Sequence, residues 1–221
     1  QLYEGKAMKV FATDDPNLVI VSYKDDATAF NGEKRGTIMG KGVINNRLTN
    51  RLMRLLEENG VPTHLVEELN DRDTLVKRVQ IVPLEVIIRN ISAGSFAKRY
   101  GVEEGIVFDQ PTIEFSYKND ELGDPLMNSY HALALKLATQ EEIDTIKAYS
   151  FKVNEVLKAF LLQHGIELVG FPINVDGTEY IERKDFTNDQ FYQMMRDAQG
   201  VPTTAAITQL QWCEIYERYV D

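Results

Sequence analysis

The run Val82-Pro83-Leu84-Glu85-Val86-Ile87-Ile88-Arg89 continues directly into Asn90-Ile91-Ser92-Ala93-Gly94-Ser95. The first half is rich in β-branched and apolar residues, which predicts a strand. Pro83 restricts one point of that strand, because proline has no N–H to donate to a neighbour. The second half changes to small and polar residues and leads toward a helix. This change from strand to turn to helix organises our interpretation of the whole chain.

The turn after this strand brings together groups that could bind an anion. Gly94 permits a tight turn, Arg89 stands at the strand's end and Ser95 lies near the start of the helix. A guanidinium group, a hydroxyl and helix-terminal N–H groups suit a phosphate or a carboxylate. A second interpretation stays open at this point, in which Ser95 is only a helix N-cap and Arg89 is half of a surface ion pair.

The segments on either side alternate between strand and helix patterns. Apolar residues recur at helical spacing from Thr37 to Asn59 and again from about Gln140 to His164, where Thr139 and Glu142 have the spacing of a capping box. Strand patterns occupy residues 9–12, 18–23, 63–69, 80–89 and 112–118. The dipeptide at 176–177 predicts a hairpin joining 171–175 to 178–181, and helices are expected near 189–198 and 208–219.

This order predicts an α+β fold with a largely antiparallel sheet. We expect a β-rich N-terminal lobe over residues 1–90 and a helix-rich C-terminal lobe over residues 91–221. Two lobes would leave a cleft between them, which is the usual place for a small-molecule site.

Composition excludes several classes of protein. The formal net charge of −10 disfavours general nucleic-acid binding, since a phosphate backbone would be repelled. A single cysteine, Cys213, permits no internal disulfide and fits a reducing cytosol. No apolar run approaches the roughly 20 residues that span a bilayer, and the N-terminus has no signal-peptide pattern. These features predict a cytoplasmic protein without membrane or nucleic-acid partners.

Other cations lie in loops that could bind a ligand, although each is weak alone. Tyr3 to Lys9 places Lys6 and Lys9 around a glycine, and Gly40-Lys41-Gly42 precedes the first long helix, where an anion could bind. The ordinary alternatives are an exposed hairpin and a flexible loop. Lys118 ends a predicted strand, and by itself it is explained better by an ordinary polar turn. No pair of histidines has metal-ligand spacing.

Taken together, these segments resemble the SAICAR synthetase (phosphoribosylaminoimidazole-succinocarboxamide synthase) family. The matching pieces occur in the family's order and spacing over about residues 1–169. They are residues 3–7, 25–32, 40–42, 62–64, 82–90, 93–95, 117–120 and 124–125.

The resemblance implies a two-lobed fold with an ATP cleft between the lobes and an ATP-dependent ligase activity. In the family, ATP phosphorylates the carboxylate of carboxyaminoimidazole ribonucleotide, and the amine of L-aspartate then displaces phosphate during de novo purine biosynthesis. Mg²⁺ is the implied metal, its ligands are unknown, and a homodimer is a frequent assembly. The implied ATP-binding residues are Lys6, Lys9, Ile81, Leu84 and Lys118. Substrates would bind to Arg89, Ser95 and Lys41, and the catalytic roles would fall to Lys118 and Arg89.

The C-terminal quarter departs from the family's pattern. After Val169 the family has Asp-Phe-Lys-(Leu/Ile)-Glu-Phe-Gly, whereas this chain has Gly170-Phe171-Pro172-Ile173-Asn174-Val175-Asp176. Lys184 stands where a metal-binding Asp belongs, and Met8 stands at a usual Lys position. A ligase would then need Asp176, Glu182 or Asp185 for its metal. The alternatives are a catalytically silent homologue that binds nucleotide or acts as an interaction module, and a diverged enzyme with ATP-independent chemistry.

Overall fold

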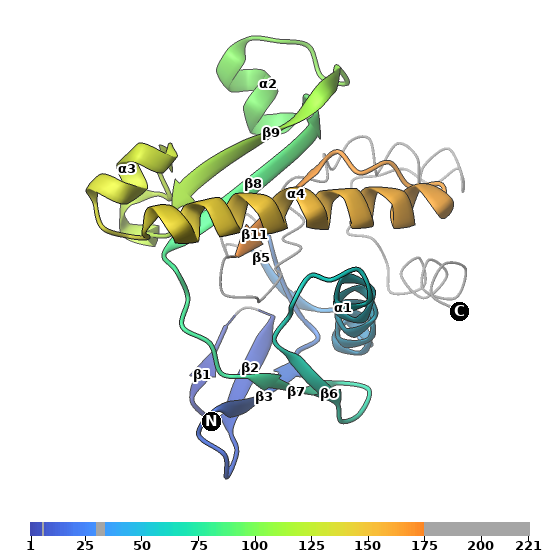
Figure 1. Ribbon diagram of the computed structural model, residues 1–221. Helices are drawn as coiled ribbons and strands as arrows, with labels where there is room; N and C mark the ends of the chain where they lie inside the picture. Colours follow the sequence, from blue (N-terminus) through green and yellow to red (C-terminus); the bar gives the residue numbers. More distant parts are fainter. Residues whose placement is uncertain (6, 30–33, 175–221) are drawn as a thin grey trace. The chain divides into compact units, whose positions relative to one another are not determined.

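The computed structural model describes residues 1–5, 7–29 and 34–174 (Figure 1). These residues belong to two compact units, one ending at Val79 and the other beginning at Gln80. The division expected between residues 90 and 91 falls inside a strand, and the extent of the two lobes stays a prediction. The hairpin expected beyond residue 174 and the two helices expected near the C-terminus lie outside the described residues.

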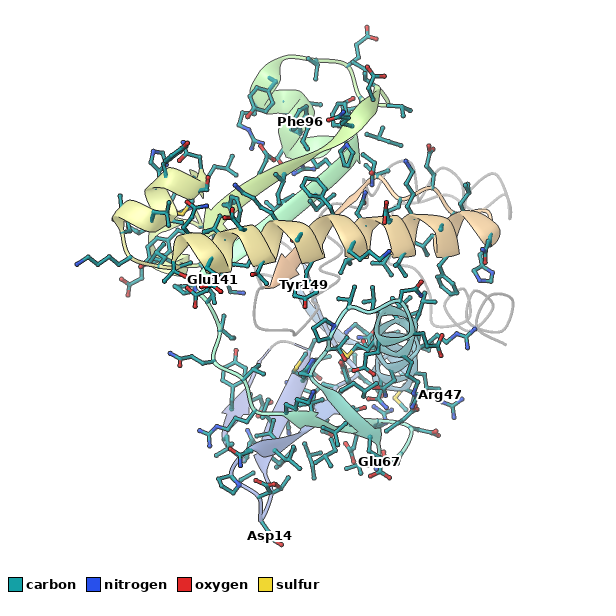
Figure 2. All side chains as sticks on the ribbon, in the orientation of Figure 1. Asp14, Arg47, Glu67, Phe96, Glu141 and Tyr149 are labelled. Carbon is teal, nitrogen blue, oxygen red and sulfur yellow. The ribbon has the colours of Figure 1, made fainter. Side chains whose placement is uncertain are left out.

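The first unit is built on a five-stranded sheet in which all neighbouring strands are antiparallel. In spatial order its strands are β1 (Tyr3–Glu4), β2 (Met8–Ala12), β3 (Leu18–Tyr23), β7 (Asp73–Lys77) and β6 (Leu65–Glu68). Figure 2 shows Asp14 at the tip of the turn that joins β2 to β3. A separate hairpin pairs β4 (Asp26–Ala29) with β5 (Lys34–Thr37).

Helix α1 (Lys41–Glu58) covers one face of this sheet (Figure 1). Its apolar stripe includes Leu52 and Leu56, which are buried. The helix also buries two asparagines against Thr74 of β7: the Thr74 hydroxyl donates to Asn46 Oδ1 at 2.6 Å, and Asn50 Nδ2 donates to Thr74 Oγ1 at 2.7 Å. These bonds satisfy polar groups that would be costly to bury alone. The helix begins at Lys41 rather than Thr37, because Gly40 takes a left-handed conformation with φ of 83°.

The second unit contains a four-stranded antiparallel sheet. Its strands, in spatial order, are β10 (Leu126–Met127), β9 (Val107–Tyr117), β8 (Leu84–Ile91) and β11 (Gly170–Asn174). The helices are α2 (Gly94–Tyr100), α3 (Ser129–Ala134) and α4 (Gln140–Gln163), with a short 3-10 turn at Asp120–Leu122. Antiparallel sheets combined with helices confirm the predicted α+β class.

Helix α4 packs along one face of β8 (Figure 1). It begins with the predicted capping box, in which Thr139 and Glu142 bond to each other's backbone N–H. Apolar residues from both elements form the core of this unit, chiefly Leu84, Val86, Phe115, Ile143 and Ile146.

Strand β8 is buried on both faces, although only one face meets α4. Asn90 and Asn154 of α4 exchange side-chain amide hydrogen bonds of 2.8 and 3.0 Å. Because side chains alternate along a strand, Asn90 facing α4 places Arg89 on the opposite face.

Strand β11 approaches β8 very closely at Gly170, which pairs with Arg89. A Cβ atom added at Gly170 would lie 2.5 Å from the carbonyl oxygen of Ile88 and 3.1 Å from the Cα of Arg89. The position where the family's motif has an aspartate therefore leaves no room for a side chain in this backbone arrangement.

Candidate active site

Arg89 is the centre of the most developed polar cluster in the second unit. Its side chain is only 2% exposed. The Nη2 group donates to Ser95 Oγ at 3.1 Å, and Nε donates to Glu114 Oε2 at 3.4 Å. The ring of Phe96 lies 6.0 Å from the guanidinium carbon. Hydrogen bonds along one edge and an aromatic ring nearby fix the orientation of a side chain that is otherwise long and flexible.

Glu114, on β9, is shared between two arginines. Its second oxygen, Oε1, accepts a hydrogen bond from Nη2 of Arg99 on α2. The Arg89–Glu114 pair is shielded from water, because the two side chains are 2% and 13% exposed, whereas Arg99 is 31% exposed. Thr112 pairs with Arg89 across the strands, and its buried hydroxyl has no hydrogen-bond partner among the residues that the structure describes. The cluster thus carries two guanidinium groups, one carboxylate and two hydroxyls.

The local sequence explains how α2 brings these groups together. Ala93 is the N-cap and offers no side-chain bond, while Gly94 adopts φ of 51° and its N–H donates to Glu104 Oε1 at 2.7 Å. Phe96 stacks at 5.2 Å from Phe108 of β9, and Figure 2 shows Phe96 within α2. Two parts of the sequence-based alternative are therefore wrong: Ser95 is not the N-cap, and Arg89 is not at the surface.

The first unit has its own acid–arginine cluster, at the start of α1. The carboxylate of Asp25 receives two hydrogen bonds of 2.8 Å from the guanidinium of Arg72 and one of 2.8 Å from the N–H of Gly42. The Arg72 hydrogen bonds, together with the backbone N–H groups of Gly42 and Gly40, lower the pKa of Asp25 to about 2. The anion at this helix N-terminus is thus the chain's own carboxylate, next to Lys41 as the first helical residue.

The remaining predicted site residues lie in different surroundings. Lys9 is on β2, with its Nζ 3.9 Å from a Glu4 oxygen. Lys118 follows β9 and is exposed, and its N–H donates to the carbonyl of Pro83 at 3.1 Å. Ile81 is half exposed, whereas Leu84 is fully buried in the core. Lys6 lies outside the described residues.

The structure therefore brings together some of these residues but not others. Arg89 and Ser95 are in direct contact, and Lys118 lies beside the segment from Ile81 to Leu84. The partners Glu114, Arg99, Asp25 and Arg72 were not among the predicted site residues. An acid within an alternating strand pattern was the only signal for Glu114, and it does not identify the arginine it will meet.

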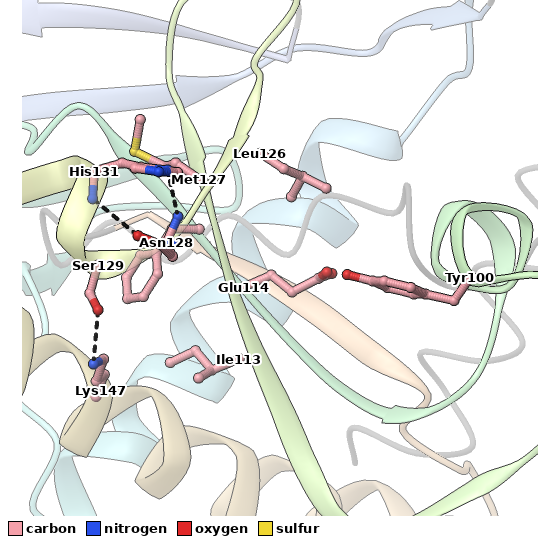
Figure 3. Close-up of a pocket in the computed structure, with 10 residues that line it drawn as sticks. Tyr100, Ile113, Glu114, Leu126, Met127, Asn128, Ser129, His131 and Lys147 are labelled. Atoms are coloured by element: carbon pink, nitrogen blue, oxygen red, sulfur yellow. Dashed lines mark hydrogen bonds between the residues drawn. The ribbon is translucent and has the colours of Figure 1, made fainter.

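A cavity of about 440 Å³ lies at the outer edge of β9 (Figure 3). Figure 3 shows the side chains of Glu114 and Tyr100 pointing toward each other at one end. At the other end Lys147 donates to Ser129 at 3.5 Å, and Asn128 and His131 cap each other at the start of α3. Many of its polar groups are thus already bonded within the protein.

Metal-ligating side chains do not gather within the part of the chain that the structure describes, where no group of three or more His, Cys, Asp or Glu could hold an ion. Asp176, Glu182 and Asp185, from which an active ligase would need a metal ligand, lie outside that part. No described helix is long and apolar enough to cross a membrane.

Comparison with family models and curated proteins gives a consistent result for the first four fifths of the chain. Residues 1–176 match the SAICAR synthetase family model, and residues 155–221 match a model of the uncharacterised DegV protein family. The phosphoribosylaminoimidazole-succinocarboxamide synthase of Lachnoclostridium phytofermentans is 67% identical over 173 residues, covering 78% of this chain and 74% of that protein. The enzyme of the same name from Coprothermobacter proteolyticus is 56% identical over 178 residues, covering 80% and 75%.

Solved structures agree with the fold described above. The phosphoribosylaminoimidazole-succinocarboxamide synthase of Ehrlichia chaffeensis superimposes with a TM-score of 0.82 at 33% identity, covering 99% of this chain and 98% of its own. A SAICAR synthetase in complex with ADP gives a TM-score of 0.83 at 35% identity, covering 99% and 97%. On the family match, the identities and the shared fold, this chain belongs to the SAICAR synthetase family.

Proposed function

We propose that this chain is an ATP-dependent carbon–nitrogen ligase that joins L-aspartate to carboxyaminoimidazole ribonucleotide in de novo purine biosynthesis. The observation that carries the proposal is a buried arginine bonded to Ser95 at 3.1 Å, in a chain that is 67% identical over 173 residues to a protein named for this synthesis. Use of ATP is supported by the ADP bound to a relative of the same fold.

The chemistry needs two steps, because a carboxylate is a poor electrophile. In the first, a carboxylate oxygen of the imidazole nucleotide attacks the γ-phosphorus of ATP, which forms an acyl phosphate and releases ADP. In the second, the aspartate amine attacks the acyl carbon, loses a proton and expels inorganic phosphate. Positive groups that are fixed before reaction stabilise the charge that develops in each step.

The proposed roles divide between two regions of the second unit. Arg89 and Ser95 hold an anionic group of the substrates, because the guanidinium is fixed before any ligand binds. Lys118 approaches the ATP phosphates, and the segment containing Ile81 and Leu84 lies beside the adenine. The hydrogen bond from the backbone N–H of Lys118 to the Pro83 carbonyl supports this pairing of roles, since the backbone of Lys118 lies beside that segment.

Further parts of the proposal concern the first unit, the metal and the cellular context. Lys6 and Lys9 assist in ATP binding and Lys41 in substrate binding. Mg²⁺ would neutralise the phosphates, and the described residues show no set of ligands that fits it. We also propose a homodimer in a cytoplasmic location, which sedimentation and cell fractionation would check.

A substrate-omission assay tests the function. Release of ADP should require ATP, L-aspartate and the imidazole nucleotide together, and a preparation of Lys118→Ala should lose that activity. Lys158→Ala, an exposed lysine change on α4, should keep it and thereby exclude a general effect of removing a lysine. ADP release without the imidazole nucleotide would contradict the proposed substrate.

Binding measurements separate the ligase from the silent homologue. Calorimetric titration of ATP with and without Mg²⁺ should show binding that depends on the metal. ATP binding without turnover of the three substrates would favour a silent homologue, and absent binding would contradict both.

A further inference from the structure

Glu114 lies between two arginines, and the proposed reaction gives it no role. One oxygen faces Nε of Arg89 on the neighbouring strand, and the other is bonded to Arg99 on α2. The carboxylate therefore ties together β8, β9 and α2. Glu114 thus neutralises part of the positive charge of the two guanidinium groups that it joins.

Holding Arg89 at Nε has a specific consequence for how it can meet a ligand. The guanidinium is planar, so a bond at Nε and another from Nη2 to Ser95 set both the direction and the plane of the group. An arginine fixed in this way loses less side-chain entropy when it binds an anion than a free one does. Preorganisation of this kind favours affinity even though Glu114 itself carries a negative charge.

Arg99 completes the arrangement from the outer side. It pairs with the oxygen of Glu114 that Arg89 does not use, and its guanidinium carbon lies 5.0 Å from the ring centroid of Tyr100. Because Arg99 restrains the carboxylate, Glu114 is held for Arg89 rather than turning toward solvent. Figure 3 shows that the carboxylate end of Glu114 also reaches the cavity at the edge of β9.

We propose that Glu114 is a positioning residue of the substrate site, which acts by orienting Arg89 and is itself held by Arg99. This inference rests on the proposed function, because Arg89 is there the residue that binds an anionic group of the substrates. Two simpler accounts compete with it. In one, Glu114 only weakens the positive charge of the site; in the other, it only stabilises the fold. The three accounts predict different results.

The decisive variant is Glu114→Gln, because it removes the charge and keeps the shape. If Glu114 positions Arg89, the KM for carboxyaminoimidazole ribonucleotide should rise about tenfold, the size expected for one hydrogen bond to a charged group. The KM for ATP should stay unchanged. If Glu114 only weakened the site's charge, its neutralisation would make nucleotide binding tighter. A KM for the nucleotide that falls or stays constant contradicts the proposal.

Two further variants keep the inference testable should Glu114→Gln fold poorly. Glu114→Asp keeps the charge but shortens the reach, so a positioning role predicts weaker nucleotide binding and a pure charge effect predicts none. Arg99→Gln leaves Arg89 untouched and should weaken nucleotide binding in the same direction by a smaller factor. Glu155→Gln on α4, whose side chain is 75% exposed, is the matched control and should change neither KM.

Thermal unfolding of each variant identifies a purely structural role. A fall in stability with an unchanged KM for the nucleotide contradicts positioning. If the wild-type chain releases no ADP but binds the nucleotide in calorimetry, the proposed function fails, and the dissociation constants of the variants still test Glu114. A wild-type chain that neither binds nor converts the nucleotide contradicts both proposals.

Discussion

Both units contain a glycine turn that precedes a helix, and each turn lies near an acid paired with arginine, but the two clusters are arranged differently. At the start of α1, Asp25 directs its oxygens at Arg72 and at the N–H of Gly42, while Arg72 remains 38% exposed. In the second unit the arginine is buried instead, and its acid is shared with a second arginine. The first arrangement closes a helix end with the chain's own carboxylate. The second holds a buried cation in place.

This difference shows what a sequence pattern of glycine, cation and helix start leaves undetermined. Gly40-Lys41-Gly42 and Ala93-Gly94-Ser95 both suggested an anion site. Only the structure shows that Asp25 already satisfies the first helix terminus, so a ligand there would have to compete with an internal carboxylate whose pKa is about 2. Lys41 keeps its proposed substrate role, but the N–H of Gly42 is already used.

Among the substitutions that compare the two clusters, Arg89→Ala should have the largest effect on stability and activity. Removing one partner of a buried ion pair costs about 3–5 kcal/mol of stability, and we expect the lower end of that range because Glu114 still pairs with Arg99. The kcat/KM for the imidazole nucleotide should fall at least about 30-fold, the lower range for truncating a buried charge pair in a binding site. Urea unfolding and steady-state kinetics measure the two quantities.

Arg47→Ala is the control for that change. Arg47 also pairs with an acid, Asp71, but it projects from α1 at the surface and is 39% exposed (Figure 2). An exposed pair contributes at most about 1 kcal/mol. Equal losses of stability in the two arginine variants would show that burial does not distinguish the clusters.

Asp25→Asn should have the second largest effect, and it should depend on pH. Hydrogen bonds from Arg72 lower the pKa of Asp25 from 3.8 to about 2 in the folded chain. Because this pKa is lower in the folded chain than in the unfolded chain, Asp25 stabilises the fold at pH values above about 3.8. That contribution disappears as the pH falls from about 3.8 toward 2. This pKa shift corresponds to roughly 2 kcal/mol of unfolding free energy at neutral pH.

Unfolding measurements of wild type and Asp25→Asn at a series of pH values test this linkage. The difference in unfolding free energy should be largest at neutral pH and shrink below about pH 4, close to the ordinary aspartate pKa. A difference that does not change with pH would mean that Asp25 acts through packing rather than charge. The variant should affect stability more than the KM for the nucleotide, in contrast to Glu114→Gln.

The sequence predicted those parts of the fold whose stability is local. Both long helices were found from periodicity, and the capping box at Thr139 was confirmed, because each signal lies within one helical turn. The strand expected to begin at residue 80 begins at Leu84 instead, since Pro83 has no N–H for the ladder. Strand β7 was missed because one of its two buried residues, Thr74, is polar, and the asparagines of α1 make that burial favourable.

The site was predictable only in part, for a related reason. Arg89 and Ser95 are six residues apart, so their proximity follows from the turn between them. Glu114 lies 25 residues beyond Arg89 and reaches it only through the pairing of β8 with β9. A buried arginine in an apolar run cannot be told from a surface arginine until its partner on another strand is known. The roles given to Lys9, Lys41, Ile81, Leu84 and Lys118 stay predictions.

Gly170→Ala tests the close approach of β11 to β8 at Arg89. Its effect on stability should be smaller than that of Arg89→Ala. The added Cβ would lie 2.5 Å from the Ile88 carbonyl oxygen and 3.3 Å from the Cγ of Arg89, so β11 or β8 must shift. Overpacking of this kind costs about 1–3 kcal/mol. The shift should also raise the KM for the nucleotide, since it moves the strand that carries Arg89.

Gly36→Ala is the matched control, because a Cβ there would meet no atom within 4 Å. Its unfolding free energy should be close to that of wild type. A Gly170→Ala variant with wild-type stability would show that the two strands can separate freely at this position.

Thr139→Ala should give the smallest effect, and it isolates helix capping from any arginine. The Thr139 hydroxyl accepts the N–H of Glu142 at 3.2 Å, as Asp25 accepts that of Gly42, but the capping box at Thr139 is formed without a guanidinium group. Loss of a side-chain N-cap costs about 1 kcal/mol. Thr139→Ser should restore the stability, because it keeps the hydroxyl. If Asp25→Asn cost no more than Thr139→Ala, the Arg72 pair would add nothing to a simple cap, and the α1 cluster would differ from an ordinary helix start only in appearance. A larger loss of stability in Asp25→Asn would show instead that the Arg72 guanidinium strengthens the cap. The two clusters would then differ in whether the arginine of the pair is buried, as Arg89 is, or partly exposed, as Arg72 is.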